Sequence, residues 1–177
     1  MDNLTEKLKK GEEEAYDILI SQFQQKIYAL SFSLLGNHED ALDTVQEVFI
    51  KIFNKISSFN GESSLSTWIF RITKNTCYDH LRKNKKNIEG EIPENMADAS
   101  PMPDELFQKK EVRMAVRAAL SSLPPKYKTV LLLREYEALS YGEIAKVLDI
   151  SEGTVKSRIS RAREYLLKEI SKNGELF

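Results

Sequence analysis

The sequence LSYGEIAKVLDISEGTVKSRISRAREYL, residues 139–166, predicts a helix, a tight turn and a second helix. Apolar residues in its first part recur at helical spacing, at Ile144, Ala145 and Leu148, and Ser151 is a suitable N-cap for the second helix. In that second helix, apolar residues three and four positions apart would form one buried stripe: Val155, Ile159, Ala162 and Leu166. The stretch therefore predicts a helix-turn-helix unit.

The remaining side of the second predicted helix is basic. Between Thr154 and Lys168 there are five basic residues and a single acid, Glu164, which gives a net charge of +4. Four of these cations lie off the apolar stripe: Lys156, Arg158, Arg161 and Arg163. Such an excess suits the phosphate-lined groove of duplex DNA. The alternative, an ordinary solvated face, is disfavoured because such faces mix the two signs more evenly.

The composition of the 177-residue chain excludes several classes of protein. Its single cysteine, Cys77, rules out an internal disulfide, and with only two histidines there is no cluster at metal-site spacing, so neither a metal nor another cofactor is expected. The charged N-terminus and the short apolar runs indicate neither a signal peptide nor a transmembrane helix. We therefore expect a cytoplasmic protein.

The charge distribution divides the chain into three parts. Residues 88–107 hold six acidic and no basic residues, together with three prolines, and lack periodic apolar positions. We expect a flexible acidic linker over residues 88–110, between an N-terminal domain, 1–87, and a C-terminal domain, 111–177. Both halves show helical periodicity, and Pro124-Pro125 would separate the first two helices of the second half. The predicted fold is all-α, with two small helical domains.

The first half begins with two predicted helices. The pattern from Glu12 to Leu35 is helical, Gly36 is placed to end it, and Asn37 can cap a second helix that runs to about Ile56. One arc of that second helix is predicted to be core: Leu42, Val45, Phe49, Ile52 and Ile56. The opposite side carries Asp40, Asp43, Glu47 and Lys51, with Gln46 and Val48 at the boundary. Composition alone favours an ordinary polar face there.

A loop over residues 59–64 precedes a third predicted helix, from about Leu65 to Arg82, which Ser63, Ser64 or Ser66 can cap. Its apolar side is expected to be Leu65, Ile69 and Ile72. Its other side combines cations with aromatic and amide groups: Arg71, Lys74, Asn75, Tyr78 and Arg82, with Trp68 at the edge. Rings for stacking and cations for phosphates are what single-stranded nucleic acid requires. Trp68 could equally be a core residue.

These motifs together resemble the extracytoplasmic-function (ECF) type of bacterial sigma factors of the sigma-70 family, which are promoter-specificity subunits of RNA polymerase. In the first half the resemblance lies in EDALD (39–43), QEVF (46–49), TW (67–68), RI (71–72), Asn75, Asp79 and LR (81–82). In the second half it lies in LSSLP (120–124), VLLLR (130–134), LSY (139–141), EIA (143–145), GTVKSR (153–158) and RAR (161–163). Each motif is weak, but their order and spacing over nearly the whole chain are specific.

The resemblance implies roles that spacing alone leaves open. The second helix would dock on the clamp helices of the largest subunit of core polymerase through Asp40, Asp43, Gln46, Glu47 and Phe49. The loop and third helix would hold the opened non-template strand of the -10 element through Asn60, Gly61, Glu62, Ser63, Ser64, Trp68, Arg71, Lys74 and Asn75. The helix after the turn would read the -35 element through Ser151, Glu152, Thr154, Lys156, Ser157, Arg158 and Arg161. The family also implies an anti-sigma factor, which can be anchored in the membrane.

One departure from the family pattern lies in the turn, where Asp149 stands at a position that is often glycine. The backbone there tends to be left-handed, and aspartate tolerates that conformation better than most residues. We therefore expect an intact turn. Because the chain ends at Phe177, we also expect no further sensing domain.

The span of the linker and the cost of melting DNA both indicate that the chain needs a larger partner to hold its two halves apart and to help open the duplex. As a random coil, a linker of about 20 residues spans roughly 25 Å, whereas promoter elements two DNA turns apart lie roughly 70 Å from each other. Melting five or six base-pair steps costs roughly 7–8 kcal/mol, more than a few stacking contacts supply. The chain alone should not open DNA.

Two other functions are compatible with parts of the sequence. A helix-turn-helix regulator that acts without polymerase would explain residues 139–166, but such a regulator normally brings a domain of alternating strands and helices, and the first half is helical throughout. An enzyme acting on nucleic acid would need a catalytic constellation, and we find no glycine-rich phosphate loop, metal cluster or nucleophile-base pair. We therefore expect a protein that is not an enzyme.

Overall fold

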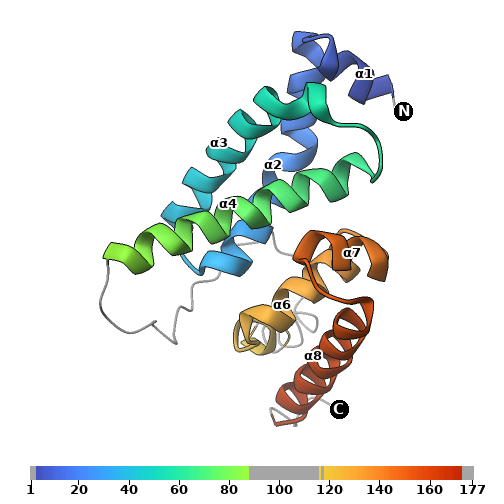
Figure 1. Ribbon diagram of the computed structural model, residues 1–177. Helices are drawn as coiled ribbons and strands as arrows, with labels where there is room; N and C mark the ends of the chain where they lie inside the picture. The colour runs from blue at the N-terminus through green and yellow to red at the C-terminus, as the bar shows by residue number, and fades with distance from the viewer. Residues whose placement is uncertain (1–2, 88–115, 117, 173–177) are drawn as a thin grey trace, which may run out of the picture.

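The computed structural model of this protein describes residues 3–87, 116 and 118–172, and every regular element in these ranges is helical (Figure 1). The all-α prediction is confirmed. The N-terminal elements are α1 (Asn3–Lys9), α2 (Glu13–Leu35), α3 (His38–Lys55), the short 3-10 helix η1 (Ile56–Ser58) and α4 (Leu65–Asn87). The C-terminal elements are α6 (Pro125–Leu131), the π-helical turn η2 (Leu132–Tyr136), α7 (Tyr141–Leu148) and α8 (Glu152–Lys172). The predicted linker, 88–110, lies outside the described residues.

Helix ends in the N-terminal unit follow local sequence signals. Gly36 ends α2 in the left-handed conformation, with φ 72°, and its N–H donates to the carbonyl oxygen of Phe32 at 2.9 Å. Asn37 caps α3, because its Oδ1 accepts the backbone N–H groups of Glu39 at 2.8 Å and Asp40 at 3.2 Å. Ser64 caps α4 and accepts the N–H of Thr67 at 3.2 Å. All three predicted boundaries are confirmed.

The buried side of α3 is rotated from the predicted arc. Val45, Ile52 and Ile56 are buried as predicted, but Leu42 is 44% exposed and Phe49 is only half-buried. Val48, which the sequence placed at the boundary, is fully buried together with Ala41. The helix packs against α2 and α4 along positions 41, 45, 48 and 52, which lie closer to one line on a 3.6-residue helix than the predicted set. The prediction for Leu42 was wrong.

The N-terminal core lies between α2, α3 and α4 and is closed by η1 and α1. It consists of aliphatic and aromatic side chains: Leu8, Ala15, Leu19, Phe23, Ile27, Val45, Val48, Ile52, Ile56, Phe59 and Ile69. Leu65, Trp68 and Ile72 pack on its edge. The core therefore leaves the polar side of α3 and one side of α4 free for other contacts.

The C-terminal unit is built around its helix-turn-helix. Pro125 occupies the first turn of α6, as a proline at a helix start should. Ser140 and Glu143 form a reciprocal capping box at the start of α7, and Asp149 ends that helix at φ 58°, ψ 51°. Ser151 then caps α8 by accepting the N–H of Thr154 at 3.1 Å. The predicted turn is therefore intact, with Asp149 in the left-handed conformation.

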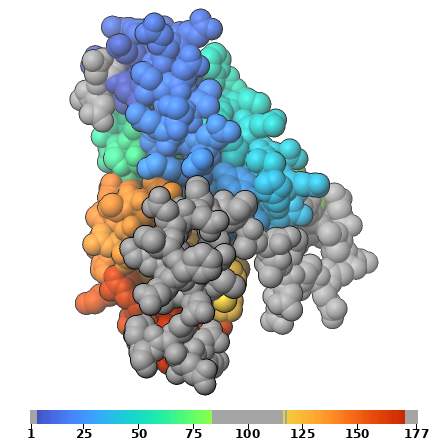
Figure 2. Space-filling view, turned by 180° about the vertical axis from the view of Figure 1, so that it is seen from behind, coloured from blue at the N-terminus to red at the C-terminus, as the bar shows by residue number. Residues whose placement is uncertain are grey.

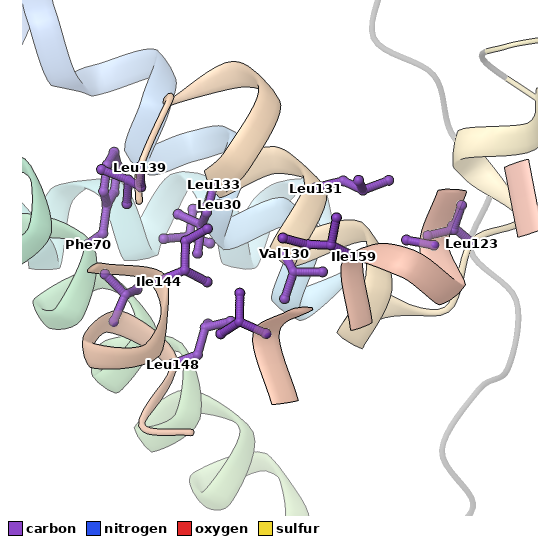
Figure 3. Packing of buried hydrophobic residues seen from close by; sticks show 13 residues of the cluster. Leu30, Phe70, Leu123, Val130, Leu131, Leu133, Leu139, Ile144, Leu148 and Ile159 are labelled. Atoms are coloured by element: carbon purple, nitrogen blue, oxygen red, sulfur yellow. The ribbon is translucent and has the colours of Figure 1, made fainter. Parts of the chain in front are cut away.

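The two units pack directly against each other. Leu30 of α2 and Phe70 of α4, both fully buried, belong to the same apolar cluster as the C-terminal core, including Leu133, Leu139 and Ile144 (Figure 3). Between the two units, α4 contacts α7 and α2 contacts α6. Seen from behind, the blue and green N-terminal surface meets the orange C-terminal surface (Figure 2). The described residues thus form a closed arrangement of two helical units.

Candidate nucleic-acid and partner interfaces

The basic surface of α8 is presented as the sequence predicted. Val155, Ile159 and Ala162 are buried against the rest of the unit, while Leu166 is half-buried. The predicted contact residues all keep accessible side chains: Ser151, Glu152, Thr154, Lys156, Ser157, Arg158 and Arg161. The Ser157 hydroxyl donates to the Thr154 carbonyl oxygen at 3.0 Å, and the hydroxyls of Ser151 and Thr154 are hydrogen-bonded to each other at 2.9 Å. The side chains at the helix start are therefore held by local hydrogen bonds, and the cations of the helix lie outside its buried stripe.

The cations of α8 differ in whether they have partners. Arg163 donates to the carboxylate of Glu135 at 2.7 Å, which raises the pKa of its guanidinium above the ordinary value. Lys156, Arg158 and Arg161 have no hydrogen-bond or ion-pair partner within residues 3–87 and 118–172. These three side chains are available to phosphates or base edges without breaking an existing contact.

The start of α7 is capped by Ser140 and Glu143. Glu143 Oε2 accepts the backbone N–H of Ser140 at 2.9 Å and the Ser140 hydroxyl at 2.8 Å. The pKa of the Glu143 carboxyl is lowered, chiefly by that N–H donor, then by the Ser140 hydroxyl, with smaller contributions from Thr67 and Ser64. An ionised Glu143 therefore stabilises α7 near neutral pH.

The predicted single-strand surface is only partly assembled on α4. Arg71 and Asn75 are exposed, and Trp68 is half-buried with its ring 5.3 Å from that of Phe59. Lys74, predicted to lie beside Arg71 on an exposed stripe, is instead only 7% exposed, and its ammonium lies 5.2 Å from the centre of the Tyr78 ring. The side of α4 that carries Lys74 also carries Phe70, which packs into the C-terminal core.

The loop before α4 is a compact polar turn. Asn60 Oδ1 accepts the Glu62 N–H at 3.3 Å, and Gly61 adopts φ 79°, a conformation that favours glycine. Asn60, Gly61, Glu62 and Ser64 are exposed and Ser63 is half-exposed. The Ser64 hydroxyl contacts Glu143 Oε1 at 3.2 Å, so this residue also contacts the helix-turn-helix. The predicted loop residues therefore lie together, but the hydroxyl of one of them, Ser64, is already bound to Glu143.

The polar side of α3 presents the residues expected to bind a partner. Asp43 and Gln46 are exposed and have no hydrogen-bond or ion-pair partner in the described ranges, whereas Glu47 pairs with Lys51 at 2.8 Å. Asp40 lies 3.1 Å from Nε2 of His80 on α4. Phe49 is half-buried beside the core.

Three exposed apolar residues lie on this same side of α3 and were missed by the sequence analysis. Ile50 is 61% exposed, Phe53 is 62% exposed, and Leu42 joins them. Positions 43, 46, 50 and 53 follow three- and four-residue steps, so Ile50 and Phe53 continue the line of Asp43 and Gln46. The spacing of these four positions can be read from the sequence. It was missed because the buried arc of α3 was predicted in a rotated position. The surface is therefore polar at one end and apolar at the other.

The described residues offer little for other chemistry. They contain no group of three or more histidine, cysteine or acidic side chains that could hold a metal ion. None of the helices over these ranges is long and apolar enough to cross a membrane. Burial raises the pKa of the Cys77 thiol to about 11, which keeps it protonated and unreactive.

Comparison with known families matches both units. Residues 19–87 match the family described as Sigma-70 region 2, and residues 113–166 match Sigma-70, region 4. These two matches cover most of α2, all of α3 and α4, and the helix-turn-helix of residues 139–166.

Several proteins that match nearly the full length of this chain are named RNA polymerase sigma factors. The chain is 34% identical over 174 residues to the ECF RNA polymerase sigma factor SigW of Bacillus subtilis, a match that covers 92% of both chains. It is 34% identical over 171 residues to the ECF RNA polymerase sigma-E factor of Escherichia coli, covering 91% of this chain and 89% of that protein. It is 33% identical over 177 residues to the RNA polymerase sigma-H factor of Pseudomonas aeruginosa, covering 94% and 92%.

Solved structures agree with the arrangement of helices. The sigma factor RpoE of Bartonella quintana, solved in complex with the anti-sigma factor NepR, superposes with a TM-score of 0.71 at 26% identity, over 88% of this chain and 96% of that one. CnrH in complex with the cytosolic domain of CnrY gives a TM-score of 0.66 at 21% identity and 97% coverage of both chains, which supports the fold.

Proposed function

The chain belongs to the ECF group of the sigma-70 family, and we propose that it binds core RNA polymerase and directs it to promoters through separate -10 and -35 contacts. Matches to regions 2 and 4 on two helical units, one of which presents the unpartnered cations of α8, are the observation that carries this proposal. Its chemistry is recognition and strand opening within the polymerase, with no enzymatic step of its own. A polymerase in the cytoplasm would place the chain there.

The helix α8 is proposed to read the -35 element in the major groove. Its first turn is capped by Ser151 and exposes Glu152 and Thr154, at the end of a recognition helix that usually contacts base edges. Lys156, Arg158 and Arg161 follow along the same helix, where arginine can bind guanine with two hydrogen bonds and lysine can bind phosphate. Arg163, already held by Glu135, is expected to contribute least.

The loop 60–64 and the exposed side of α4 are proposed to hold the opened non-template strand of the -10 element. Arg71 and Asn75 are accessible, and Trp68 has a partly exposed ring on which a base can stack. Lys74 could join them only after its buried side of α4 becomes accessible. The proposal therefore assigns Arg71, Asn75 and Trp68 the direct contacts in the described arrangement.

Core polymerase is proposed to bind the outward side of α3. Asp43 and Gln46 are free to pair with cationic or amide groups, and Ile50 and Phe53 add apolar area on the next turns. Exposed apolar residues next to polar ones are typical of a protein interface, in which buried aromatic anchors supply much of the affinity. Asp40 and Glu47, which already have partners, and Phe49 would contribute mainly by supporting the helix surface.

An anti-sigma factor is the second expected partner. The sigma factor RpoE of Bartonella quintana, whose structure resembles this chain, was solved in complex with the anti-sigma factor NepR. A regulator of this kind would restrict the factor to the conditions under which its promoters are needed.

Transcription in vitro tests the proposed function. Purified chain is added to core polymerase with a library of promoters, and specific transcripts well above the core-only background are expected. A polymerase-independent regulator would instead bind a palindromic duplex tightly and fail to co-elute with core polymerase on gel filtration. The match to region 2 disfavours that alternative. Absence of any transcript above background would refute the proposal.

A further inference from the structure

Gly142 is the second residue of α7, and its backbone conformation does not require glycine. Positive φ angles occur at Gly11, Gly36 and Gly61, and Gly142 is not among these glycines. Inside a helix, glycine is less favourable than alanine because it loses more backbone entropy on folding. A helical glycine without a positive φ therefore needs another explanation.

The space beside Gly142 is taken by a side chain of the next helix. A Cβ placed on Gly142 would lie 3.0 Å from Oε1 and 3.7 Å from Cδ of Glu152, the first residue of α8. The shorter of these distances is tighter than ordinary van der Waals contact, so an alanine at position 142 would push the carboxylate away. The missing side chain of Gly142 thus allows the Glu152 carboxylate to lie against the first turn of α7.

The Glu152 carboxylate is exposed and has no hydrogen-bond or ion-pair partner among the residues that the structure describes. Glu143, on the same turn of α7 as Gly142, differs, because N–H and hydroxyl donors bind both of its carboxylate oxygens. The first turn of a helix favours negative charge, which helps to hold the Glu152 carboxylate beside α7. Glu152 therefore offers free acceptor atoms in a restricted position.

We propose that Glu152 selects a cytosine in the -35 element and that Gly142 is the positioning residue that sets its carboxylate for this contact. The inference rests on the proposed function, since it names a base preference of the same α8 surface. Glu152 lies in the first turn of α8, the part of a recognition helix that usually contacts base edges. An ionised carboxylate only accepts hydrogen bonds, and cytosine presents a donor, its N4 amino group, in the major groove.

The other three bases suit a carboxylate less well. Guanine presents two acceptors, N7 and O6, thymine presents an acceptor and a methyl group, and in adenine the N6 amino group lies beside the acceptor N7. A wrong base also leaves a desolvated carboxylate without a partner, which costs more than the lost hydrogen bond itself. The expected discrimination is about fivefold to a hundredfold in favour of cytosine at one position.

Discrimination of this size depends on where the carboxylate is held. A hydrogen bond weakens when its distance and angle change, and a side chain that samples many positions loses entropy when it binds. The contact with α7 restricts Glu152 before DNA binds, and the absence of a Cβ at Gly142 permits that contact. Gly142 therefore influences base selection through Glu152 rather than through a DNA contact of its own.

A promoter library measures the preference directly. Core polymerase and the full chain are combined on promoters in which each -35 base pair is varied in turn, and the transcripts from each promoter are counted. We expect the wild type to favour cytosine at one position. Glu152→Gln, whose amide both donates and accepts, should reduce that preference by about tenfold at this position alone. Unchanged selectivity of Glu152→Gln at every position would refute the proposal.

Variants of Gly142 test the positioning role. Gly142→Ala should lower the cytosine preference severalfold, and Gly142→Met, whose longer unbranched side chain also suits a helix, should lower it to the level of Glu152→Gln. In a Glu152→Ala background, neither substitution should change selectivity further. Wild-type selectivity in both Gly142 variants, or an equal change in the absence of Glu152, would show that Gly142 does not position this carboxylate.

Controls separate this inference from the proposed function. Lys146→Ala, at an exposed position of α7, should leave the base preferences unchanged. Circular dichroism and co-elution with core polymerase show that each variant is folded, so that altered selectivity reports the DNA contact. If the wild type gives no transcript, the proposed function fails. If it initiates and the variants of Glu152 and Gly142 keep its base preferences, only the present inference fails.

Discussion

Glu143 accepts the backbone N–H of Ser140 at 2.9 Å and thereby completes a capping box at the first turn of the helix-turn-helix. Replacing Glu143 with alanine removes this acceptor and the two hydroxyl contacts from α4. We expect a loss of about 1 kcal/mol in the free energy of unfolding, as for other lost caps. Urea unfolding followed by circular dichroism measures it. Lys146→Ala, at an exposed position on the same helix, should change stability by less than about 0.5 kcal/mol.

The same carboxylate predicts a pH dependence. Its pKa is lowered in the folded protein, chiefly by the Ser140 N–H, so the ionised form is favoured by folding. The stabilisation is therefore fully present above the unfolded pKa of about 4.3 and is lost as the pH falls through the lower folded value. The stability difference between wild type and Glu143→Ala should shrink as the pH is lowered from 7 toward 3. A difference that grew with acidity would contradict this assignment.

Ala138 is a second position with a measurable effect on stability. It adopts φ 53° between η2 and α7, a left-handed conformation that costs an alanine roughly 1 kcal/mol. Ala138→Gly removes this cost but adds backbone entropy to the unfolded chain. The net increase in the free energy of unfolding should be at most about 0.5–1 kcal/mol. Thermal and urea unfolding both measure the change. Ala119→Gly is the matched control: it lies in a helical segment and should destabilise.

Local signals in the sequence predicted the helix boundaries because their causes are local. Gly36, Asn37 and Ser151 act through backbone atoms within a few residues, and the structure shows each acting as expected. Asp149 was expected in the left-handed conformation because the family that the sequence resembles often has glycine at that position, and the structure confirms it. The left-handed Ala138 could not be recognised, because alanine carries no sequence signal for that conformation.

Side-chain exposure was predicted less well, because it depends on neighbours distant in the sequence. Lys74 appeared to belong to an open basic stripe, yet the side of α4 around Phe70 is covered by the C-terminal unit. Leu42, which was predicted to be buried, is exposed, and Val48, which was predicted to lie at the boundary, is buried. The reason is that α3 packs against both α2 and α4, and the apolar pattern of one helix does not show where its two neighbours lie. The contact of Ser64 with Glu143, 79 residues apart, has no local signal at all.

The exposed aromatic residue on α3 predicts a measurable contribution to polymerase affinity. Phe53 is 62% exposed, and its ring centre lies 5.1 Å from that of Tyr16. Phe53→Ala should weaken core polymerase binding by about tenfold or more, in line with aromatic anchors at other interfaces, while changing stability little. Fluorescence anisotropy with labelled chain measures it. Ile18→Ala, a 43% exposed residue on α2, is the control; equal effects from both variants would argue against a specific α3 interface.

The cations of α8 predict a separation between promoter reading and polymerase binding. Arg161 is exposed and has no partner among the described residues, whereas Arg163, two positions later, is bound to Glu135 at 2.7 Å. A base contact from arginine is worth about 1–3 kcal/mol, so Arg161→Ala should reduce initiation from promoters with a -35 element by about fivefold to a hundredfold. Arg163→Ala, which removes an exposed ion pair worth at most about 1 kcal/mol, should have a much smaller effect. Core polymerase binding should be unchanged in both variants, since α3 lies in the other unit. If Arg161→Ala lost initiation and polymerase binding together, misfolding of the chain would explain the result better than a lost DNA contact, and circular dichroism of the variant would distinguish the two.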